Sequence, residues 1–412
     1  MSKTIVSIDI ASSKIVCLIA QLDKSGSLFI KGASLLESSG IQNGNIVNIK
    51  LAIQTIIKTL SKAEKMFGKN VDNVSINING SKLKSKVLTI KKHFKASKTI
   101  TKNMVMSMSE ELLEELDNNG KRAIHLVPLE FDLDGIKTTN PFGTQAKNIE
   151  TKLQVFYTDK SKVENISSCF KKISISVKNV IFDGFASALS VLNGYEMENG
   201  VLVIDIGAGS SSFSIINNNR FIFGNSIPIA GETITNDIAN VIGVSYAVAE
   251  KVKVMNTNLY LDPMEETEMI KIDIDGEETY RAAENKKKII NDIVRSRVEE
   301  VIELILRLLE KKDLLNSFNS IVITGGTANV PGLDNYITKT FGIKTRIGRP
   351  EDFTVSQNIN ENEMKDPSYA TSVGILKFVK HYNEKKDFED YRNGFGGIVG
   401  RIIGFLTKIF TS

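Results

Sequence analysis

The chain of 412 residues contains only two cysteines and three histidines, and this scarcity limits its chemistry. Cys17 and Cys169 each lie inside an apolar run, which is typical of buried thiols in a reducing compartment rather than of a disulfide framework. His93, His125 and His381 stand far apart, with no cysteine or carboxylate at ligand spacing. These patterns argue against a secreted, disulfide-rich protein and against a structural zinc site.

Prolines are also few, and the net charge is small. Seven prolines, with 42% apolar and 24% charged residues, indicate a chain that folds over most of its length and has no long disordered linkers. Its length is two to three times that of the usual ~150-residue domain, so we expect at least two packed units. The net charge of +4 is too small to favour nucleic acid as a partner, and none is expected.

Long hydrophobic runs are absent too. No stretch of ~20 uncharged apolar residues occurs, so no helix is expected to cross a bilayer. The N-terminus carries Lys3, Asp9 and Lys14 among its apolar residues, lacks the apolar core of a signal peptide and is expected to form a strand. We therefore expect a soluble or peripheral protein.

The same order of elements occurs twice along the chain. In the first copy we expect strands at 4–10, 14–21, 28–35 and 71–80, and a helix that begins after Asn48 and ends near Gly68. In the second copy we expect strands at 201–206, 211–217 and 220–227, and a helix that begins after Gly231-Glu232. A repeated half-unit of this kind is typical of an α/β domain.

Residues 82–158 separate the two copies and are interpreted as an inserted subdomain. We expect a polar helix at 107–118 and strands near 124–131 and 151–156. Further along, one stripe of apolar residues predicts a long helix at 280–315, most simply a helix that packs against a core.

Three turns rich in glycine or hydroxyl residues follow strands of this pattern. They are Ile8-Asp-Ile-Ala-Ser-Ser-Lys14, Val203-Ile-Asp-Ile-Gly-Ala-Gly-Ser-Ser211 and Ile321-Val-Ile-Thr-Gly-Gly-Thr-Ala328. Small residues let backbone N–H groups close on phosphate oxygens, and hydroxyls add donors. Asp9 and Asp205, one at each hairpin, suit a hydrated Mg²⁺, which takes only one or two carboxylates. One such turn is usually an ordinary hairpin, but three in this order on duplicated units indicate a phosphate site.

Neither of the two common phosphate-binding fingerprints is present. The sequence has no Gly-x-x-x-x-Gly-Lys-[Ser/Thr] loop, and Gly207-x-Gly209 is not followed by the third glycine of a dinucleotide motif. P-loop and Rossmann interpretations are therefore excluded.

The arrangement resembles the actin, Hsp70 and sugar-kinase superfamily, in which two similar lobes close on ATP. The resemblance implies an α/β, two-lobed, actin-like ATPase fold of duplicated βββαβα units, with an inserted α+β subdomain in the first lobe and a C-terminal amphipathic helix. Residues 9–14 match the first phosphate hairpin, 205–211 the second and 324–328 the adenosine turn, with Ala11 where many members carry glycine. The segments 183–188 and 368–374 look like the two helices that connect the lobes.

The resemblance also implies the site residues. Asp9 and Asp205 would hold Mg²⁺ through water, and Asp183 would either position a water for hydrolysis or cap a helix. The residues expected to bind ATP are Asp9, Ser12, Ser13, Lys14, Asp205, Gly207, Gly209, Ser210, Ser211, Gly231, Glu232, Gly325, Gly326 and Thr327.

Within the superfamily, the sequence is most similar to the FtsA family of bacterial cell-division proteins. The stretches at 40–48, 229–239 and 322–333 carry this resemblance, as does the place of the inserted subdomain. It implies an ATP-binding, filament-forming adaptor, at most a weak ATPase, that ties the FtsZ ring to the inner face of the cytoplasmic membrane at the division site. In the family, the FtsZ tail docks on the subdomain that corresponds to 232–312.

The family pattern divides the chain as follows. The first lobe comprises 1–81, 161–196 with the connecting helix, and the closing helix at 353–382, with the subdomain 82–160 inserted. The second lobe has its core at 197–231 and 313–352 and its outer subdomain at 232–312. A linker at 383–393 leads to a membrane-targeting helix at 394–412.

The C-terminal segment is amphipathic and basic. At ~1.5 Å per residue its ~16 residues are too short to span a bilayer, so we expect them to lie in an anionic interface. Burying the apolar side chains and pairing the basic ones return ~12 kcal/mol, and ordering ~16 residues costs as much or more. Several tails acting together, as in a filament, would be needed for stable attachment. The residues expected to contact lipid are Phe395, Ile398, Val399, Arg401, Ile402, Ile403, Phe405, Leu406, Lys408, Ile409 and Phe410.

Several alternatives remain open from the sequence. The tail could pack on its own protein. The chain could be a pilus-assembly actin-like ATPase, which is not expected to end in an amphipathic anchor. A sugar-kinase-type phosphotransferase would need a catalytic base and a sugar-reading polar cluster that we do not identify. A chaperone of the Hsp70 type would need a substrate-binding domain after the second lobe.

Overall fold

The structure is a computed structural model that describes residues 4–23, 26–78, 83–138, 140–260, 269, 272–274, 277–279 and 287–383. The expected membrane-targeting helix at 394–412 lies outside the described residues, as does the expected linker apart from Asn383. None of the helices within the described ranges is long and apolar enough to cross a bilayer.

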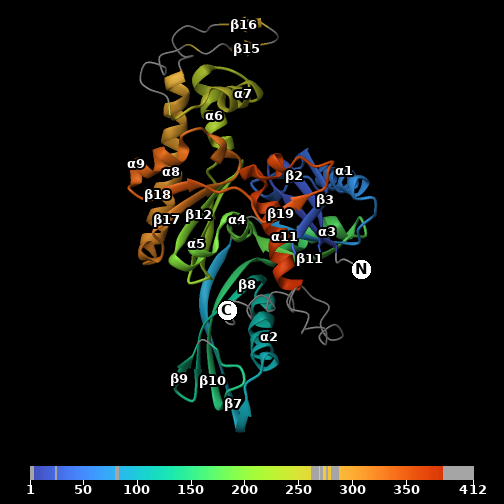
Figure 1. Ribbon diagram of the computed structural model, residues 1–412, viewed down its shortest axis with the longest axis vertical. Coiled ribbons are helices and arrows are strands. Elements are labelled where there is room, and N and C mark those ends of the chain that lie inside the picture. The colour runs from blue at the N-terminus through green and yellow to red at the C-terminus, as the bar shows by residue number, and fades with distance from the viewer. Residues whose placement is uncertain are drawn as a thin grey trace.

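Two sheets with the same strand order form the centre of the two lobes (Figure 1). The first lobe contains β3 (Leu28–Glu37), β2 (Lys14–Leu22), β1 (Thr4–Ile10), β6 (Asn73–Ile78) and β11 (Ser176–Phe182), with β19 (Phe353–Val355) added beside β3. The second contains β14 (Arg220–Ile227), β13 (Ser211–Asn217), β12 (Val201–Ile206), β17 (Ser320–Thr324) and β18 (Lys344–Ile347). In each sheet the first three strands are antiparallel and the next two are parallel. The duplicated units expected from the sequence are confirmed.

Helices cover both sheets and cross between the lobes. The first lobe carries α1 (Ile49–Phe67) and α3 (Lys160–Lys171), and the second carries α5 (Gly194–Asn199), α9 (Leu333–Phe341) and the 3₁₀ turns η3 (Leu315–Ser317) and η4 (Gly326–Asn329). The outer part of the second lobe consists of α6 (Gly231–Ile242), α7 (Tyr246–Asn256), α8 (Lys287–Glu310) and the pair β15 (Ile272–Ile274) and β16 (Glu277–Thr279). Between the lobes lie α4 (Asp183–Val191) and α11 (Ala370–Asn383) (Figure 1). The short elements α10 (Glu361–Met364) and η5 (Pro367–Tyr369) precede α11 in the chain.

The inserted segment forms a separate antiparallel sheet. Its strand order is β7 (Lys84–Thr99), β10 (Gln145–Asp159), β8 (Lys121–Leu133) and β9 (Ile136–Thr138). The helix α2 (Lys102–Asn118) packs on one face, where Leu113, Leu116, Leu126 and Leu153 form a small core. A second two-stranded hairpin, β4 (Ile41–Gln42) and β5 (Asn45–Ile46), lies in the first lobe.

Local signals placed some boundaries correctly and others wrongly. Asn48 caps α1 through its side chain, and Gly68 ends it in the left-handed conformation, as expected. The expected helix at 107–118 begins earlier, at Lys102, because the Thr101 hydroxyl accepts the N–H of Met104. The expected helix at 280–315 is α-helical only over Lys287–Glu310 among its described residues, since a tight turn at Asp313 (φ 56°) follows it.

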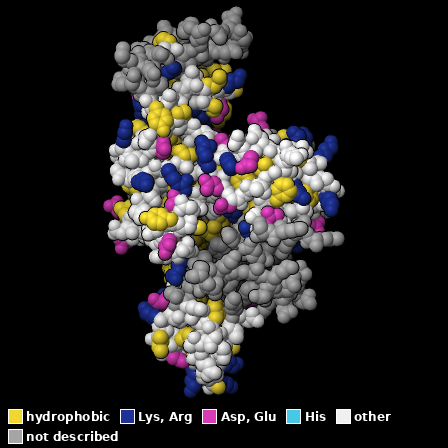
Figure 2. All heavy atoms as spheres, viewed as in Figure 1, with side chains coloured by type: hydrophobic (Ala, Val, Ile, Leu, Met, Phe, Trp, Pro, Cys, Tyr) yellow, Lys and Arg dark blue, Asp and Glu magenta, His cyan; other side chains and the backbone are white. Residues whose placement is uncertain are grey.

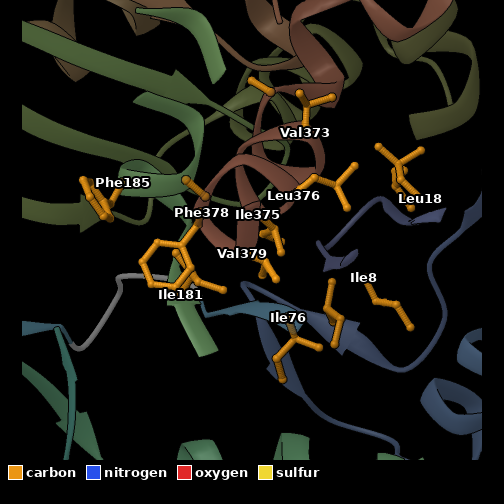
Figure 3. Close-up of a cluster of buried hydrophobic side chains, with 14 of the residues drawn as sticks. Ile8, Leu18, Ile76, Ile181, Phe185, Val373, Ile375, Leu376, Phe378 and Val379 are labelled. Atoms are coloured by element: carbon orange, nitrogen blue, oxygen red, sulfur yellow. The ribbon is translucent and has the colours of Figure 1, made fainter. Parts of the chain in front are cut away.

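The main core lies where α11 crosses the first sheet. Figure 3 shows Val373, Leu376 and Val379 of α11 above Ile8 and Ile76 of the sheet, all of them buried. On its other side α11 meets α4. A Cβ on Gly374 would collide with the carbonyl oxygen of Ala186, so the backbones of the two helices are in contact at this point. On the face drawn in Figure 2, basic and acidic side chains are interspersed over both lobes, as the small net charge predicts.

His125 joins the inserted subdomain to this junction. Its Nε2 accepts the backbone N–H of Phe182 at 3.0 Å, immediately before α4. Its ring makes edge contacts with phenylalanines of four other elements, at centroid distances of 6.5 Å (Phe156), 5.2 Å (Phe185), 6.0 Å (Phe221) and 6.0 Å (Phe378). This burial lowers the pKa of His125 from 6.5 to about 3.

The buried His125 should make stability depend on pH. Between pH 6.5 and about 3 the unfolded chain binds a proton on this ring and the folded chain does not, so the contribution of His125 to folding stability rises with pH across that window. From pH 6.5 down to 5 the loss amounts to about 2 kcal/mol. His125→Gln keeps an acceptor for Phe182 but does not titrate, so its unfolding free energy should lack this component when urea denaturation is measured from pH 5 to 8.

The exposed His93 provides the matched control. His93→Gln removes an exposed imidazole and leaves His125 in place, so the component that His125 contributes to the pH dependence should remain. If the unfolding free energies of the native chain and His125→Gln changed equally with pH, the pH dependence could not be assigned to His125.

Candidate functional site

The three turns singled out in the sequence line one cavity of about 690 Å³ between the two lobes. Every residue expected to bind ATP borders it except Ser211, and the expected catalytic residue Asp183 borders it too. Ser211 is buried, and its hydroxyl donates to the carbonyl oxygen of Ile229 at 2.6 Å, so it supports the hairpin and does not line the cavity.

The two hairpins approach each other closely across the cavity. A Cβ placed on Gly209 of the second lobe would lie 2.6 Å from the Ser12 hydroxyl and 2.8 Å from Asn43 Oδ1, both in the first lobe. Glycine is therefore required there for contact between the lobes. The second hairpin also meets the start of α6, because Gly231 N–H donates to Gly207 O at 3.0 Å and Glu232 N–H to Ala208 O at 2.8 Å.

The two glycines of the third turn have different surroundings. Gly325 has a φ of 87°, and a Cβ there would collide with Asp205 Oδ1 and lie 2.7 Å from Ile206 O. A Cβ on Gly326 would meet nothing within 4 Å. Gly325 thus allows Asp205 to approach the turn, whereas Gly326 faces the open cavity.

The carboxylates of both hairpins are held by hydroxyls of the crossing helices. Ser187 of α4 donates to Asp205 Oδ2 at 2.5 Å and Thr371 of α11 donates to the same oxygen at 3.1 Å. Ser372 of α11 donates to Asp9 Oδ2 at 3.2 Å. Any movement of α4 against α11 therefore displaces the groups at the floor of the cavity.

Burial strongly disfavours negative charge on these carboxyls. It raises the pKa of Asp9 to about 7, although the nearby Lys14 opposes the shift, and it raises the pKa of Asp205. Burial and the charge of Asp205 raise the pKa of Asp183 to about 7. A cation placed among them would favour the ionised forms.

Lys14 and Asp183 also line the cavity. Lys14 donates to Ser368 O at 2.8 Å and lies 5.0 Å from the Tyr369 ring centroid, and burial lowers its pKa. Asp183 is the first residue of α4, where its carboxylate accepts the Gly184 N–H at 2.8 Å. The N-cap of α4 is Phe182, whose side chain makes no capping hydrogen bond. Asp183 therefore supports the start of the helix only through its bond to Gly184 and through the favourable position of an acidic side chain in the first turn.

The cavity is also lined by residues of α7 that the sequence did not single out. Lys253 of α7 donates to Glu250 at 2.7 Å and to the Thr235 hydroxyl at 2.8 Å, beside Gly231. Thr257 is 5% exposed, borders the cavity and has a hydroxyl without a hydrogen-bond partner. A Glu-x-x-Lys pair is common on exposed helices, so no local signal could have revealed this cluster.

Two family models match the sequence. The model described as "Type IV pilus assembly protein PilM" matches residues 7–260, more than half of the chain, and the model described as "Cell division protein FtsA" matches residues 202–374. They overlap at 202–260, and by the longer match the chain belongs to the PilM-type family of actin-like proteins.

Curated relatives cover nearly the whole chain. The cell division protein FtsA of Borreliella burgdorferi is 27% identical over 92% of this chain and 92% of its own length. That of Streptococcus pneumoniae is 25% identical over 97% of this chain and 87% of its own length. The chain is a homologue of FtsA. It is thus an FtsA-like cell-division protein of the actin family.

Solved structures show the fold of this FtsA homologue. The PilM-PilN type IV pilus biogenesis complex matches with a TM-score of 0.66 at 16% identity, covering 91% of this chain and 98% of that one. MreB 5 of Spiroplasma citri bound to AMPPNP matches with a TM-score of 0.58 at 14% identity, over 94% and 99% of the two chains. The MamK double helical filament matches at 0.53 and 12% identity, over 92% and 98%. The actin-like α/β fold expected from the sequence is confirmed.

Proposed function

We propose that this FtsA homologue binds ATP with Mg²⁺ in the cavity between its lobes and uses the nucleotide mainly as an assembly ligand. The convergence of the three turns on one cavity is the observation that carries the proposal. Its volume of about 690 Å³ lies in the range of small-molecule sites. A structural relative, MreB 5, was solved with AMPPNP, which supports a nucleotide for this fold.

The residues of the cavity fit such a ligand. The hairpins at 9–14 and 205–211 would hold the phosphates with backbone N–H groups and the hydroxyls of Ser12, Ser13 and Ser210. Asp9 and Asp205, one at each hairpin, would hold Mg²⁺ through water, and the cation would favour the ionised forms of their carboxyls. Bound ATP would supply a triphosphate that both lobes contact. The bond to its terminal phosphate would be open to slow hydrolysis.

The remaining residues would hold the nucleoside and a water. Gly325, Gly326 and Thr327 would border the nucleoside from one side. Thr257 would offer its unpaired hydroxyl from the other side. Asp183, with a pKa raised to about 7, would orient a water molecule, and the resulting activity would be at most weak.

We propose further that the protein polymerises on the inner face of the cytoplasmic membrane and anchors the FtsZ ring there at the division site. The FtsA relatives support this role, and the MamK filament shows that the fold supports polymers. The outer part of the second lobe, 232–312, would receive the FtsZ tail. Its described surface exposes Val241, Val254 and Met255, and apolar side chains are visible in this part of Figure 2.

A second candidate function is the assembly of a pilus-type complex. The PilM model covers the inserted subdomain and both hairpins, and the similar PilM was solved in a complex with PilN. The FtsA relatives, which extend over 92% and 97% of this chain, favour the division role. Binding to FtsZ and to lipid would separate the two candidates.

Removing the C-terminal segment 394–412 should abolish membrane attachment. We expect the native chain with ATP to sediment with anionic liposomes and to carry FtsZ with it, because many weak tails act together on a polymer. The shortened chain should remain in the supernatant and still bind nucleotide. Unchanged sedimentation of the shortened chain would contradict the proposed anchor.

Point substitutions sharpen this experiment. Phe405→Glu places a charge on the apolar stripe of the expected anchor and should release the protein. Phe388→Glu makes the same change in the expected linker and should not. If the native chain bound liposomes but did not carry FtsZ with it, the result would favour the pilus-type candidate.

A further inference from the structure

The segment from Gly40 to Asn48 forms a short hairpin that is fixed at its base. Gly40 O accepts the N–H groups of Val47 at 2.9 Å and Asn48 at 3.0 Å, and Asn48 in turn caps α1. The strands β4 and β5 are joined by Asn43 (φ 47°) and Gly44 (φ 65°), the left-handed pair of a type I′ turn. The base of this hairpin is therefore fixed to the start of α1.

The tip lies where the two phosphate hairpins meet. Gly44 is buried and borders the cavity, and its N–H donates to the Ser12 hydroxyl at 3.2 Å. Asn43 reaches the other lobe, because its Oδ1 would be 2.8 Å from a Cβ on Gly209. The segment between β3 and β4 lies beside the first hairpin, because Ser38 N–H donates to Ser13 O at 2.9 Å.

We propose that Asn43 and Gly44 set the preference of the site for a nucleoside triphosphate over a diphosphate. This inference rests on the proposed nucleotide function. The two nucleotides differ only in the terminal phosphate, and the tip contacts the turn of each lobe that would hold the phosphate chain. The Gly44 N–H borders the cavity and can exchange the Ser12 hydroxyl for a phosphate oxygen, and the amide group of the neighbouring Asn43 carries a further donor.

A change of charge without a change of shape tests this role. Asn43→Asp keeps the left-handed turn, since aspartate tolerates this conformation, but it puts a negative charge beside the hairpins. Repulsion grows with the charge of the ligand, so the variant should weaken ATP binding about tenfold more than ADP binding. Asn43→Gly keeps the turn and removes the donor, and should lower the ATP-to-ADP affinity ratio less strongly.

Gln42→Glu is the matched control, because it makes the same change of charge one residue away, at a position that is also exposed. Dissociation constants for ATP and ADP would be measured with Mg²⁺ on the full chain by competition with a fluorescent nucleotide, and thermal unfolding without nucleotide would show that each variant folds. A lowered ratio for Asn43→Asp with a native ratio for Gln42→Glu supports the assignment.

Two results would overturn it. One is a native ATP-to-ADP ratio in both Asn43 variants. The other is an equal fall of the ratio in Gln42→Glu and Asn43→Asp, which would reflect general repulsion and not contact at the tip. Binding of neither nucleotide by the native chain would instead refute the proposed function itself, and the inference with it.

Discussion

Gly325→Ala should abolish nucleotide binding and lower the free energy of unfolding by about 3 kcal/mol. The added Cβ would collide with Asp205 Oδ1 and crowd Ile206 O, and the φ of 87° is costly for any residue with a Cβ. Asp205 would have to leave the hydroxyls of Ser187 and Thr371. The turn and the proposed magnesium site would be disrupted together.

The neighbouring glycine provides the control. Gly326→Ala adds the same atom where nothing lies within 4 Å, so stability should change by less than about 0.5 kcal/mol. Because this Cβ enters the cavity, nucleotide affinity should fall moderately. Urea denaturation and nucleotide titration of both variants would measure the difference. Equal effects of the two substitutions would contradict the assignment of Gly325 as the packing residue and Gly326 as the open one.

The sequence could predict the features that depend on neighbouring residues. The side chain of Asn48 caps α1 and Gly68 ends it, because both act through their own backbone or the next turn. The apolar runs located β1, β2, β3 and β6 of the first sheet and β12, β13 and β14 of the second, and their repeated order predicted the duplicated fold. The strands β11, β18 and β19 were not among those expected. Short glycine-rich turns after buried strands located the cavity for the same reason.

Contacts between distant segments could not be predicted. Nothing in the sequence distinguishes Gly325 from Gly326, because their difference depends on Asp205, which arrives from another strand. His125 looked like an isolated histidine, yet it joins the inserted subdomain to α4. Thr257 and Asn43 likewise acquire their roles only when α7 and the β4–β5 hairpin pack beside the turns.

Gly374→Ala should produce the second large effect. α4 and α11 are in backbone contact there, and an added Cβ would collide with the Ala186 carbonyl oxygen. Two rigid helices cannot give way at a single atom, so we expect a loss of about 3 kcal/mol or more in the free energy of unfolding. Gly194→Ala, a helical position with nothing within 4 Å, should instead be neutral or stabilise by up to about 1 kcal/mol.

The Gly374 variant should lose nucleotide affinity as well as stability. Thr371 and Ser372, which precede Gly374 on α11, donate to Asp205 and Asp9, so a displaced α11 pulls on both carboxylates. Affinity would be measured at low temperature, where the variant remains folded by its circular dichroism. A folded variant with native affinity would show that the hydroxyls do not transmit the helix position to the site. If Gly374→Ala lost both stability and nucleotide affinity while Gly194→Ala kept its affinity, the crossing helices and the cavity would act as one unit.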